Sequence, residues 1–405
     1  MTVQQESARE IPITYGGDRL RPRLPLEDIA RSERLPSYLF PNGVTGWVTT
    51  SAEDFRFFLG DPRFHAKRFV GEPQAGKVSI EVPEMEGFIP GLNGPEHLRV
   101  RRLAAGDFSV KRIAQRRPLV ERVVEKYLNK LDEHGSPADL YKIYNLPIPS
   151  EVIAGILGVP ESRTPAFQHA AASTIGAGAG TPDADAQEAA NAVADLHSIV
   201  REVVEIKRRE PADDLITRLV QAGLTPTEIC GLCTNLLIAG HETTATSSAL
   251  SVAALLTRED QMRLFLENPD KLPEAVEELV RFVFTISDSA AGIPRLATED
   301  VEYAGYHIKK GDWVMPAAAT ANIDPSVCPV KPTELDLTRD RIPHLTFGFG
   351  AHTCLGQHLA RLELQIILSR LFQRFPTLEL VTPINEMPWI EEGFGYRMAE
   401  LMVRW

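Results

Sequence analysis

The sequence predicts a mainly α-helical fold with a small β portion, organised as a single domain over residues 1–405. Long segments repeat apolar residues at helical spacing, whereas runs that alternate apolar and polar residues are short. We find neither an internal repeat nor a linker that would divide the chain. A chain of this length can therefore form one large helical body that encloses a cofactor.

The helical pattern is clearest in long apolar-periodic segments, at about 111–133, 186–209, 226–256, 273–284 and 355–375. The segment from residue 226 follows Thr225-Pro226-Thr227-Glu228, a capping box with proline at the first helical position. Strand-like runs occur at 46–49 and within 301–314, where turn residues separate them. Segment 171–185 is rich in small residues and lacks large apolar anchors, so we expect a mobile connection there.

Charge and hydropathy exclude several classes of function. The formal net charge of −12 argues against nucleic acid as the main partner, because phosphate-binding proteins are usually basic. The first ten residues are polar and charged, and no run approaches the ~18 consecutive apolar residues that a membrane span needs. We therefore expect a cytoplasmic protein without a signal peptide or membrane anchor.

The cysteines are too few and too scattered for a disulfide framework; they are Cys230, Cys233, Cys328 and Cys354. The Cys230-x-x-Cys233 pair could be a redox pair or half of a metal site. It falls inside the helical pattern of 226–256, and no second close pair of Cys or His completes a zinc site. We therefore interpret both thiols as core residues.

Cys354 has a different setting, within Phe347-Gly348-Phe349-Gly350-Ala351-His352-Thr353-Cys354-Leu355-Gly356. It lies between glycine turns and the start of an apolar-periodic helix, where unpaired N–H groups favour the thiolate. The glycines allow the backbone to approach something large and flat. A thiolate presented by a loop is one way in which proteins ligate haem iron for O–O cleavage. The alternative is a buried structural cysteine after a glycine-rich turn.

This stretch closely resembles the haem-binding signature of the cytochrome P-450 family. The resemblance extends from about residue 90 to the C-terminus, and the first ninety residues fit it more loosely. It implies the cytochrome P-450 fold and a haem b (iron protoporphyrin IX) whose iron is ligated by Cys354. Further cofactor contacts implied within this stretch are Phe347, Gly348, His352 and Gly356.

The helical segment 226–256 carries Ala239-Gly240-His241-Glu242-Thr243-Thr244 in the middle of an apolar pattern. Glycine and hydroxyl side chains there can weaken the backbone hydrogen bonds and open room for a small molecule. An acid followed by an alcohol suits proton delivery, with Glu242 feeding Thr243. The family's oxygen-activation motif matches these residues and implies a cofactor contact at Ala239. The alternative is a set of polar residues on an exposed helix face.

Haem propionates are anions that enter a largely apolar pocket, so cations or hydrogen-bond donors must lie close to them. The family's His-x-x-x-Arg pattern matches His97 and Arg101, one helical turn apart. Arg295 and His352 match two further propionate contacts. For each of these residues, the alternative is a solvated cation.

Glu278 and Arg281 are three residues apart on one predicted helix face, where they can form an ion pair. In the family this pair is structural and is usually joined by a second arginine from the segment before the haem loop. Here Glu334 stands where that arginine is expected. The three-member network is therefore in doubt, unless another residue such as Arg339 completes it.

The resemblance also implies electrons from NAD(P)H through a ferredoxin reductase and a ferredoxin. An acidic protein that binds an acidic ferredoxin needs a local basic patch. Basic residues cluster near the predicted haem-contacting helix, at Arg99, Arg102, Lys111, Arg112, Arg116 and Arg117. Two amphipathic helices with solvated faces would explain them equally well.

The function we expect is that of a monomeric haem-thiolate monooxygenase that hydroxylates a small organic substrate, resembling actinomycete enzymes of secondary metabolism. The same chemistry could instead give oxidative C–C or C–N coupling or epoxidation, because substrate pose decides the outcome. Expected substrate contacts are Phe88, Ile89, Leu236, Ala239, Ala291, Ile293 and Phe394. The rival interpretations are a haem-thiolate sensor without turnover and a helical protein in which the four cysteines collect a metal.

Overall fold

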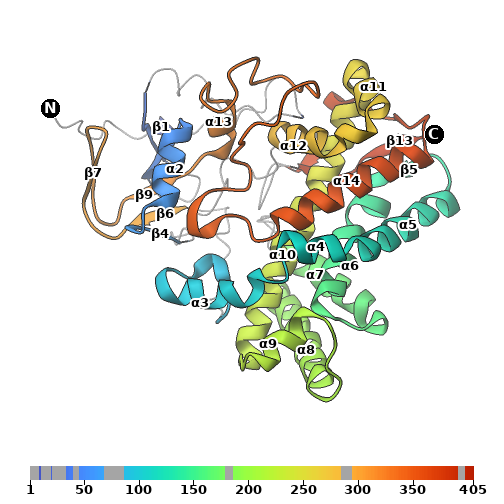
Figure 1. Ribbon diagram of the computed structural model, residues 1–405, viewed down its shortest axis with the longest axis horizontal. Coiled ribbons are helices and arrows are strands. Elements are labelled where there is room, and N and C mark those ends of the chain that lie inside the picture. Colours follow the sequence, from blue (N-terminus) through green and yellow to red (C-terminus); the bar gives the residue numbers. More distant parts are fainter. Residues whose placement is uncertain are drawn as a thin grey trace.

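The computed structural model describes residues 9–10, 20, 33–39, 45–67, 86–177, 186–283, 294–390 and 397–405. A helical body occupies one side of the molecule and a smaller sheet region lies on the other (Figure 1). The predicted class, mainly α with a small β portion, is therefore confirmed.

Helix α10 (Pro226–Leu256) runs through the middle of the helical body. It packs against α6 (Pro147–Leu157), α8 (Ala186–Arg209) and α14 (Gln357–Arg374). Most of its residues are buried on every side, as expected for a helix that is apolar all round. Its N-terminus has both hydrogen bonds of the predicted capping box, between Thr225 and Glu228.

The remaining helices surround this centre. The longer ones are α2 (Ala52–Gly60), α3 (Gly94–Ala105), α5 (Arg117–His134), α7 (Thr164–Ala177), α11 (Glu259–Glu267) and α12 (Leu272–Phe282). Shorter helices are α4 (Val110–Gln115), α9 (Leu215–Gln221) and α13 (Ala318–Ile323). Single turns include η1 (Ile89–Gly91), the π-helical η2 (Tyr141–Asn145), and η5 (Gly350–His352), which lies just before Cys354.

Two sequence predictions of secondary structure are wrong. The single helix expected at 111–133 is divided into α4 and α5 around Arg116, because Pro118 lacks an N–H and cannot continue the preceding helix. The mobile connection expected at 171–185 is helical as far as Ala177, at the end of α7, where alanines favour helix. The rest of that segment lies outside the described residues.

The largest sheet has the order β1-β2-β3-β9-β6-β4. Its strands are β1 (Arg9–Glu10), β2 (Ser37–Leu39), β3 (Thr45–Val48), β4 (Phe64–Ala66), β6 (Arg295–Ala297) and β9 (Trp313–Met315). Strand β9 runs parallel to β3 and antiparallel to β6. The sheet matters for the site because β6 carries Arg295 between two neighbouring strands.

Smaller sheets complete the β portion. The predicted strand region 301–314 contains the hairpin β7 (Val301–Tyr303) and β8 (Tyr306–Ile308), which turns at Gly305 with a positive φ. Strands β5 (Ala138–Asp139), β10 (Glu379–Leu380) and β13 (Met402–Arg404) form a second small sheet. Strands β11 (Trp389–Ile390) and β12 (Arg397–Met398) form a third, and β12 contacts α10.

Candidate functional site

The loop that presents Cys354 is tightly folded. Gly348 and Gly350 both have positive φ, and a Cβ on Gly350 would lie 2.5 Å from the carbonyl oxygen of Leu59 in α2. The Cys354 N–H donates to the Phe347 carbonyl oxygen over 2.8 Å. Because α14 begins at Gln357, this bond holds the cysteine just before a helix N-terminus, as the sequence predicts.

Cys354 retains exposed surface, whereas Cys230, Cys233 and Cys328 are buried. Desolvation by the surrounding protein raises the pKa of Cys354, while the Gly356 backbone N–H and the nearby arginines Arg101 and Arg361 lower it. For the polypeptide alone, desolvation therefore acts against the thiolate that the sequence predicts, while the helix terminus and the two arginines favour it.

Four basic side chains from three elements meet beside this loop, and we call them the cation cluster: His97, Arg101, Arg295 and His352. The rings of His97 in α3 and His352 in η5 stack with their centroids 3.9 Å apart. An Arg101 N–H donates to the Thr353 carbonyl oxygen. Arg295 in β6 is 2% exposed. The structure therefore brings together all four residues that the sequence assigns to propionate binding.

Like charges and burial destabilise the charged forms in this cluster. Burial, with help from His97, Arg295, Arg101 and His65, lowers the pKa of His352 to about 3. Burial and the two cluster arginines also lower the pKa of His97. Burial lowers the pKa of Arg101 and lowers that of Arg295 to about 10. A group with several anionic oxygens would relieve this positive potential.

His97 supplies a further sign of a missing polar partner. Its Nε2 atom is buried and has no hydrogen-bond partner among the described residues. Buried polar nitrogens are almost always hydrogen-bonded in folded proteins. The donor set of the cluster therefore suits a bound anion better than it suits the polypeptide alone.

The centre of α10 does not have the arrangement expected from its sequence. The helix is continuous through Gly240, whose Cβ would lie 3.1 Å from Ile153 Cδ1, so this glycine permits close packing on α6. The Thr243 hydroxyl donates to the Ala239 carbonyl oxygen over 2.6 Å, which competes with the backbone ladder without breaking it. Ala239 and Thr243, one turn apart, keep exposed surface on this otherwise buried helix.

Glu242 points away from Thr243. Its Oε1 atom lies 2.5 Å from Arg397 Nε in β12, and Tyr141 Oη donates to the same oxygen over 3.4 Å. Successive side chains on a helix do not face each other, so the acid and the alcohol make no direct hydrogen bond. Sequence reasoning missed Arg397 and Tyr141, because neither is near Glu242 in the chain.

The expected substrate contacts are only partly described. Phe88, Ile89 and Leu236 are buried, and Ala239 is exposed. Ala291, Ile293 and Phe394 lie outside the described residues.

A close backbone crossing holds the Phe88–Ile89 segment against α10. A Cβ on Gly231 would lie 1.9 Å from the Glu86 carbonyl oxygen, and one on Gly87 would lie 2.2 Å from the Glu228 carbonyl oxygen. The two glycines allow this loop to lie directly on the helix. A glycine at 231, within the helical pattern, is a sequence signal that could have indicated the crossing.

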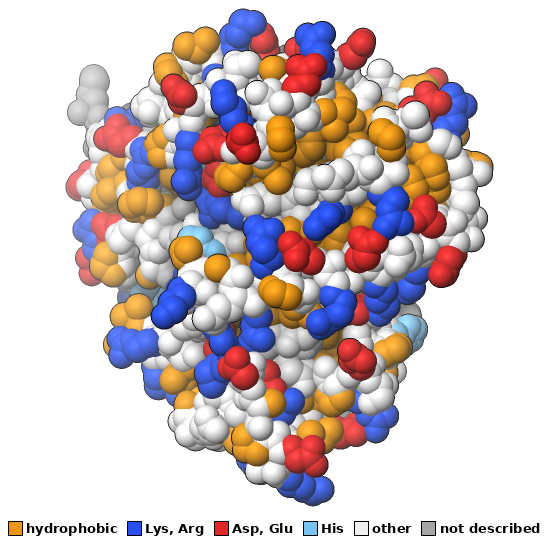
Figure 2. Space-filling view, turned by 45° about the vertical axis from the view of Figure 1, so that its right-hand side comes forward, with side chains coloured by type: hydrophobic (Ala, Val, Ile, Leu, Met, Phe, Trp, Pro, Cys, Tyr) orange, Lys and Arg blue, Asp and Glu red, His pale blue; other side chains and the backbone are white. Residues whose placement is uncertain are grey.

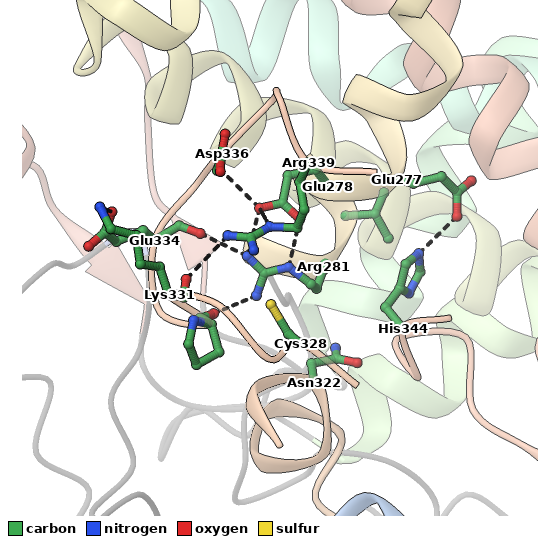
Figure 3. A network of polar contacts seen from close by, with 12 residues as sticks. Glu277, Glu278, Arg281, Asn322, Cys328, Lys331, Glu334, Asp336, Arg339 and His344 are labelled. Carbon is green, nitrogen blue, oxygen red and sulfur yellow. Dashed lines mark hydrogen bonds and ion pairs between the residues drawn. The ribbon is translucent and has the colours of Figure 1, made fainter. Parts of the chain in front are cut away.

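A second charged group surrounds the two adjacent acids of α12, and we call it the α12 network: Glu277, Glu278, Arg281, Arg339, His344 and Arg361. Figure 3 shows how Arg281 and Arg339 converge on Glu278. Arg281 donates to both carboxylate oxygens of Glu278 over 2.7 Å each, and Arg339 Nε donates to Oε1 over 3.2 Å. The hypothesis that Arg339 completes the network is confirmed.

Glu334 does not disrupt this network, because its backbone rather than its side chain takes part. Its carbonyl oxygen accepts a hydrogen bond from Arg281 Nη2 over 2.8 Å, while its carboxylate pairs with Lys331. The Pro332 carbonyl oxygen accepts another hydrogen bond from Arg281. The Glu334 side chain, which stands where the family usually has arginine, is therefore exposed to solvent here.

The other half of the network reaches the Cys354 loop. Arg361 in α14 binds both carboxylate oxygens of Glu277 and stacks over the Phe347 ring, 4.2 Å from its centroid. His344 Nε2 lies 2.9 Å from Glu277 Oε2. Burial alone would raise the pKa of Glu277, but His344 and Arg361 outweigh it and the pKa lies at about 2. Sequence reasoning missed both partners.

The remaining cysteines are core residues, as predicted for Cys230 and Cys233. Both belong to the main hydrophobic cluster, and burial raises the pKa of each thiol. Within the described part of the chain, no group of three or more His, Cys, Asp or Glu side chains could hold a metal ion. The interpretation in which the four cysteines collect a metal is therefore wrong.

Fold and site together define a mainly helical protein that presents one accessible cysteine beside a partly buried group of basic side chains. The family model described as Cytochrome P450 matches residues 179–398, more than half of the chain. Over 369 residues the chain is 37% identical to nocardicin C N-oxygenase of Nocardia uniformis subsp. tsuyamanensis, covering 90% of this chain and 91% of that protein. It is 35% identical to cytochrome P450-SU2 of Streptomyces griseolus, and the match covers 100% of both chains.

Solved structures give the same result. The crystal structure of CYP105P1 in complex with filipin I matches with a TM-score of 0.88 and 34% identity, covering 98% of this chain and 99% of that one. The chain belongs to the cytochrome P450 family, and it is an oxidoreductase of the monooxygenase type. The family implies a haem iron with a thiolate ligand. Among the described residues, no helix is long and apolar enough to span a membrane.

Proposed function

We propose that the chain is a single-domain cytoplasmic monooxygenase that acts as a monomer and hydroxylates a C–H bond of a small organic substrate. The observation that carries this proposal is the accessible Cys354, which is held by a glycine loop beside the partly buried cation cluster. Haem b supplies the oxygen-activating chemistry when bound. The polypeptide supplies the ligand, the counter-charges, the proton path and the substrate pocket.

The residues present fit a haem. Cys354 is the sulfur ligand, and metal coordination would overcome the burial that raises the pKa of its thiol. The cation cluster would hold the two propionates, which suits its depressed pKa values and the unpartnered Nε2 of His97. Phe347, Gly348, Gly356 and Ala239 would line the macrocycle, and Ala239 keeps exposed surface at the centre of α10.

Thr243 and Glu242 would manage protons. Thr243 keeps exposed surface one turn from Ala239, so its hydroxyl can turn from the Ala239 carbonyl toward the site. Glu242 is a buried acid whose pKa is raised by desolvation, a property typical of groups that exchange protons near neutral pH. Because their side chains diverge, water would have to connect them.

The substrate class follows from the relatives and remains part of this proposal. Nocardicin C N-oxygenase and the complex of CYP105P1 with filipin I point to secondary metabolites. Hydroxylation is the outcome we propose; C–C or C–N coupling and epoxidation use the same chemistry and differ in substrate pose. Phe88, Ile89 and Leu236 would contact the substrate, together with Ala291, Ile293 and Phe394.

A ferredoxin, reduced by NAD(P)H through its reductase, would supply the electrons. Three of the six basic residues considered for docking already pair with acids: Arg99 with Glu228, Arg112 with Asp213, and Arg117 with Glu121. Arg102 and Lys111 are exposed. On the face drawn in Figure 2, acidic and basic side chains are interspersed. A docking face would therefore depend mainly on Arg102 and Lys111.

Replacing Thr243 tests the proposed proton path. In Thr243→Ala we expect normal haem content, CO binding and substrate binding, with NADPH still oxidised but more of it lost as peroxide. General acids contribute about 10²–10⁴-fold, so product yield per NADPH should fall clearly. The measurement is product and peroxide per NADPH, with a substrate found by spectral screening. Unchanged yield would show that Thr243 has no part in proton delivery.

A further inference from the structure

The loop that carries Phe88 crosses α10 at two glycines. Gly231 belongs to the helix, and a Cβ at this position would overlap the Glu86 carbonyl oxygen. Gly87 belongs to the loop, and a Cβ there would overlap the Glu228 carbonyl oxygen. The contact is therefore between two backbones, which can approach this closely because neither glycine has a side chain.

The glycine at 231 serves this contact and not the helix itself. Glycine in a helix interior is less favourable than alanine by about 1 kcal/mol, so α10 alone would be more stable with another residue. Gly240, further along the same helix, differs because a Cβ there would meet only the side chain of Ile153, at 3.1 Å. A side chain can adjust its rotamer, whereas a peptide group moves only with its whole loop. A side chain at 231 therefore requires the loop to move.

The crossing lies on the side of α10 that faces the site. Residues at intervals of four form one row along this helix: Gly231, Asn235, Ala239 and Thr243. Ala239 and Thr243 are the members of the row that keep exposed surface. With a rise of about 1.5 Å per residue, the crossing lies ~12 Å from Ala239 along the helix axis. The loop is therefore held at one end of the exposed strip of α10.

Further contacts hold the same loop. Arg99 Nη2 in α3 lies 2.5 Å from Glu228 Oε1, so α3 is tied to the turn of α10 that the loop crosses. The single turn η1 contacts both helices. Two backbone hydrogen bonds of 3.1 Å each close this turn, and Phe88 and Ile89 are 6% and 4% exposed. The loop is therefore held between α3 and α10.

We infer that the crossing of Gly87 and Gly231 sets the size limit of the substrate pocket, because it holds Phe88 and Ile89 as a fixed wall. Gly231 is then a positioning residue that determines specificity without touching the substrate. This inference rests on the substrate contacts proposed for Phe88 and Ile89. Molecules that fit beside the closed loop are accepted, whereas larger ones that need the loop to move away from α10 are disfavoured.

Adding a methyl group at the crossing tests the inference on the full-length haem-loaded protein. Gly231→Ala places a Cβ on the Glu86 carbonyl oxygen, so the loop must move away. The helix itself should not be weakened, because alanine favours helix. The matched control is Gly106→Ala at the end of α3, where the backbone is also α-helical and a Cβ would meet no atom within 4 Å.

A second variant disturbs the crossing from the loop side. Gly87 has a φ of 82°, which asparagine adopts more readily than most residues, but the Cβ of Gly87→Asn would overlap the Glu228 carbonyl oxygen. The matched control is Gly305→Asn in the β7–β8 turn, where φ is 86° and a Cβ would meet no atom within 4 Å. The ferrous–CO spectrum and thermal unfolding report haem ligation and folding for all four variants.

Amide hydrogen exchange reports the position of the loop without reference to activity. In Gly231→Ala and Gly87→Asn, the N–H groups of Gly91 and Leu92 should exchange about tenfold faster, because the turn that they close loses its support. The controls should exchange as the wild type does. Unchanged exchange in the crossing variants would overturn the inference, since the loop would then not depend on the crossing.

Azole probes of different size report the pocket. Imidazole and clotrimazole both bind iron through a ring nitrogen, and optical titration gives each Kd. In the crossing variants, clotrimazole should gain affinity relative to imidazole by about tenfold, because only the larger probe reaches the wall. The Kd of imidazole should stay near the wild-type value. The controls should leave the ratio of the two Kd values unchanged, and an equal change in Gly106→Ala would contradict the inference.

Variants of the wall itself separate the inference from the proposed function. If neither Phe88→Ala nor Ile89→Ala alters the ratio of the two Kd values, the proposed substrate contacts fail and the inference fails with them. If these variants alter the ratio but Gly231→Ala and Gly87→Asn do not, despite faster exchange in the loop, only the inference about the crossing fails.

Discussion

The α12 network and the cation cluster both adjoin the segment that leads to Cys354, but their charges are balanced differently. In the α12 network, two carboxylates and three arginines interlock with backbone carbonyl oxygens, so the polypeptide alone satisfies the buried charges. In the cation cluster, His97 and His352 have their pKa values lowered by burial and by neighbouring cations. The first is satisfied by the chain itself, and the second has the features that we expect of a binding site for an anion.

Breaking the α12 network should have the largest effect on the stability of the protein. Arg281→Ala leaves Glu278 buried without its bidentate partner, so we expect the free energy of unfolding to fall by ~3–5 kcal/mol. Chemical denaturation checks this value. The matched control is Glu334→Ala, which removes only the exposed pair with Lys331 and should change stability by less than about 0.5 kcal/mol. Equal losses in the two variants would contradict the role given to the Glu334 backbone.

Removing a cation from the cluster should act on the cofactor instead. Arg101→Met removes one half-buried cation and its hydrogen bond to Thr353. We expect haem to be released faster, with an affinity loss of about 1.5–3 kcal/mol, because a charge-assisted hydrogen bond is lost. Transfer of haem to an excess of apomyoglobin measures the rate. An unchanged release rate, with reduced stability of the polypeptide, would place Arg101 among the structural residues.

The two groups should also lose stability in different ranges of pH. The pKa of His97 lies below its ordinary value of 6.5, so the unfolded chain binds more protons and stability falls as pH drops below 6.5. The pKa of Glu277 is about 2 rather than 4.5, so its contribution is present above pH 4.5 and is lost as pH falls toward 2. In acid-unfolding experiments, His97→Phe should reduce the loss of stability that occurs as pH drops below 6.5. Glu277→Gln should reduce the loss that occurs as pH falls from 4.5 toward 2.

The comparison also shows where sequence reasoning succeeds. Periodicity and the capping box predicted α10 to the residue, and the motif around Cys354 predicted the loop and His352. Separate matches to family patterns predicted His97, Arg101 and Arg295. These signals are local, or they are matches to a family pattern. Arg339 was proposed only as one way to complete a network, and the loop that brings it to Glu278 cannot be derived from spacing.

Sequence patterns did not predict the contacts between segments that are distant in the chain. Arg397 and Glu242 meet because a short hairpin packs on the middle of α10, and Arg361 meets Phe347 because the Cys354 loop folds back on α14. The break at Pro118 was visible but was outweighed by the apolar periodicity on both sides of it. Local patterns therefore predicted the elements and the ligand, whereas tertiary packing determined how the charged side chains are shared.

The central claim is that Cys354 ligates the haem iron, whereas the other cysteines are buried core residues. The most direct test is the spectrum of the reduced protein with CO, recorded for the wild type and for single Cys→Ser variants. The account predicts the strongly red-shifted Soret band of a thiolate–haem in the wild type, in Cys230→Ser and in Cys233→Ser, and its loss in Cys354→Ser. A red-shifted band that survives in Cys354→Ser would contradict the account.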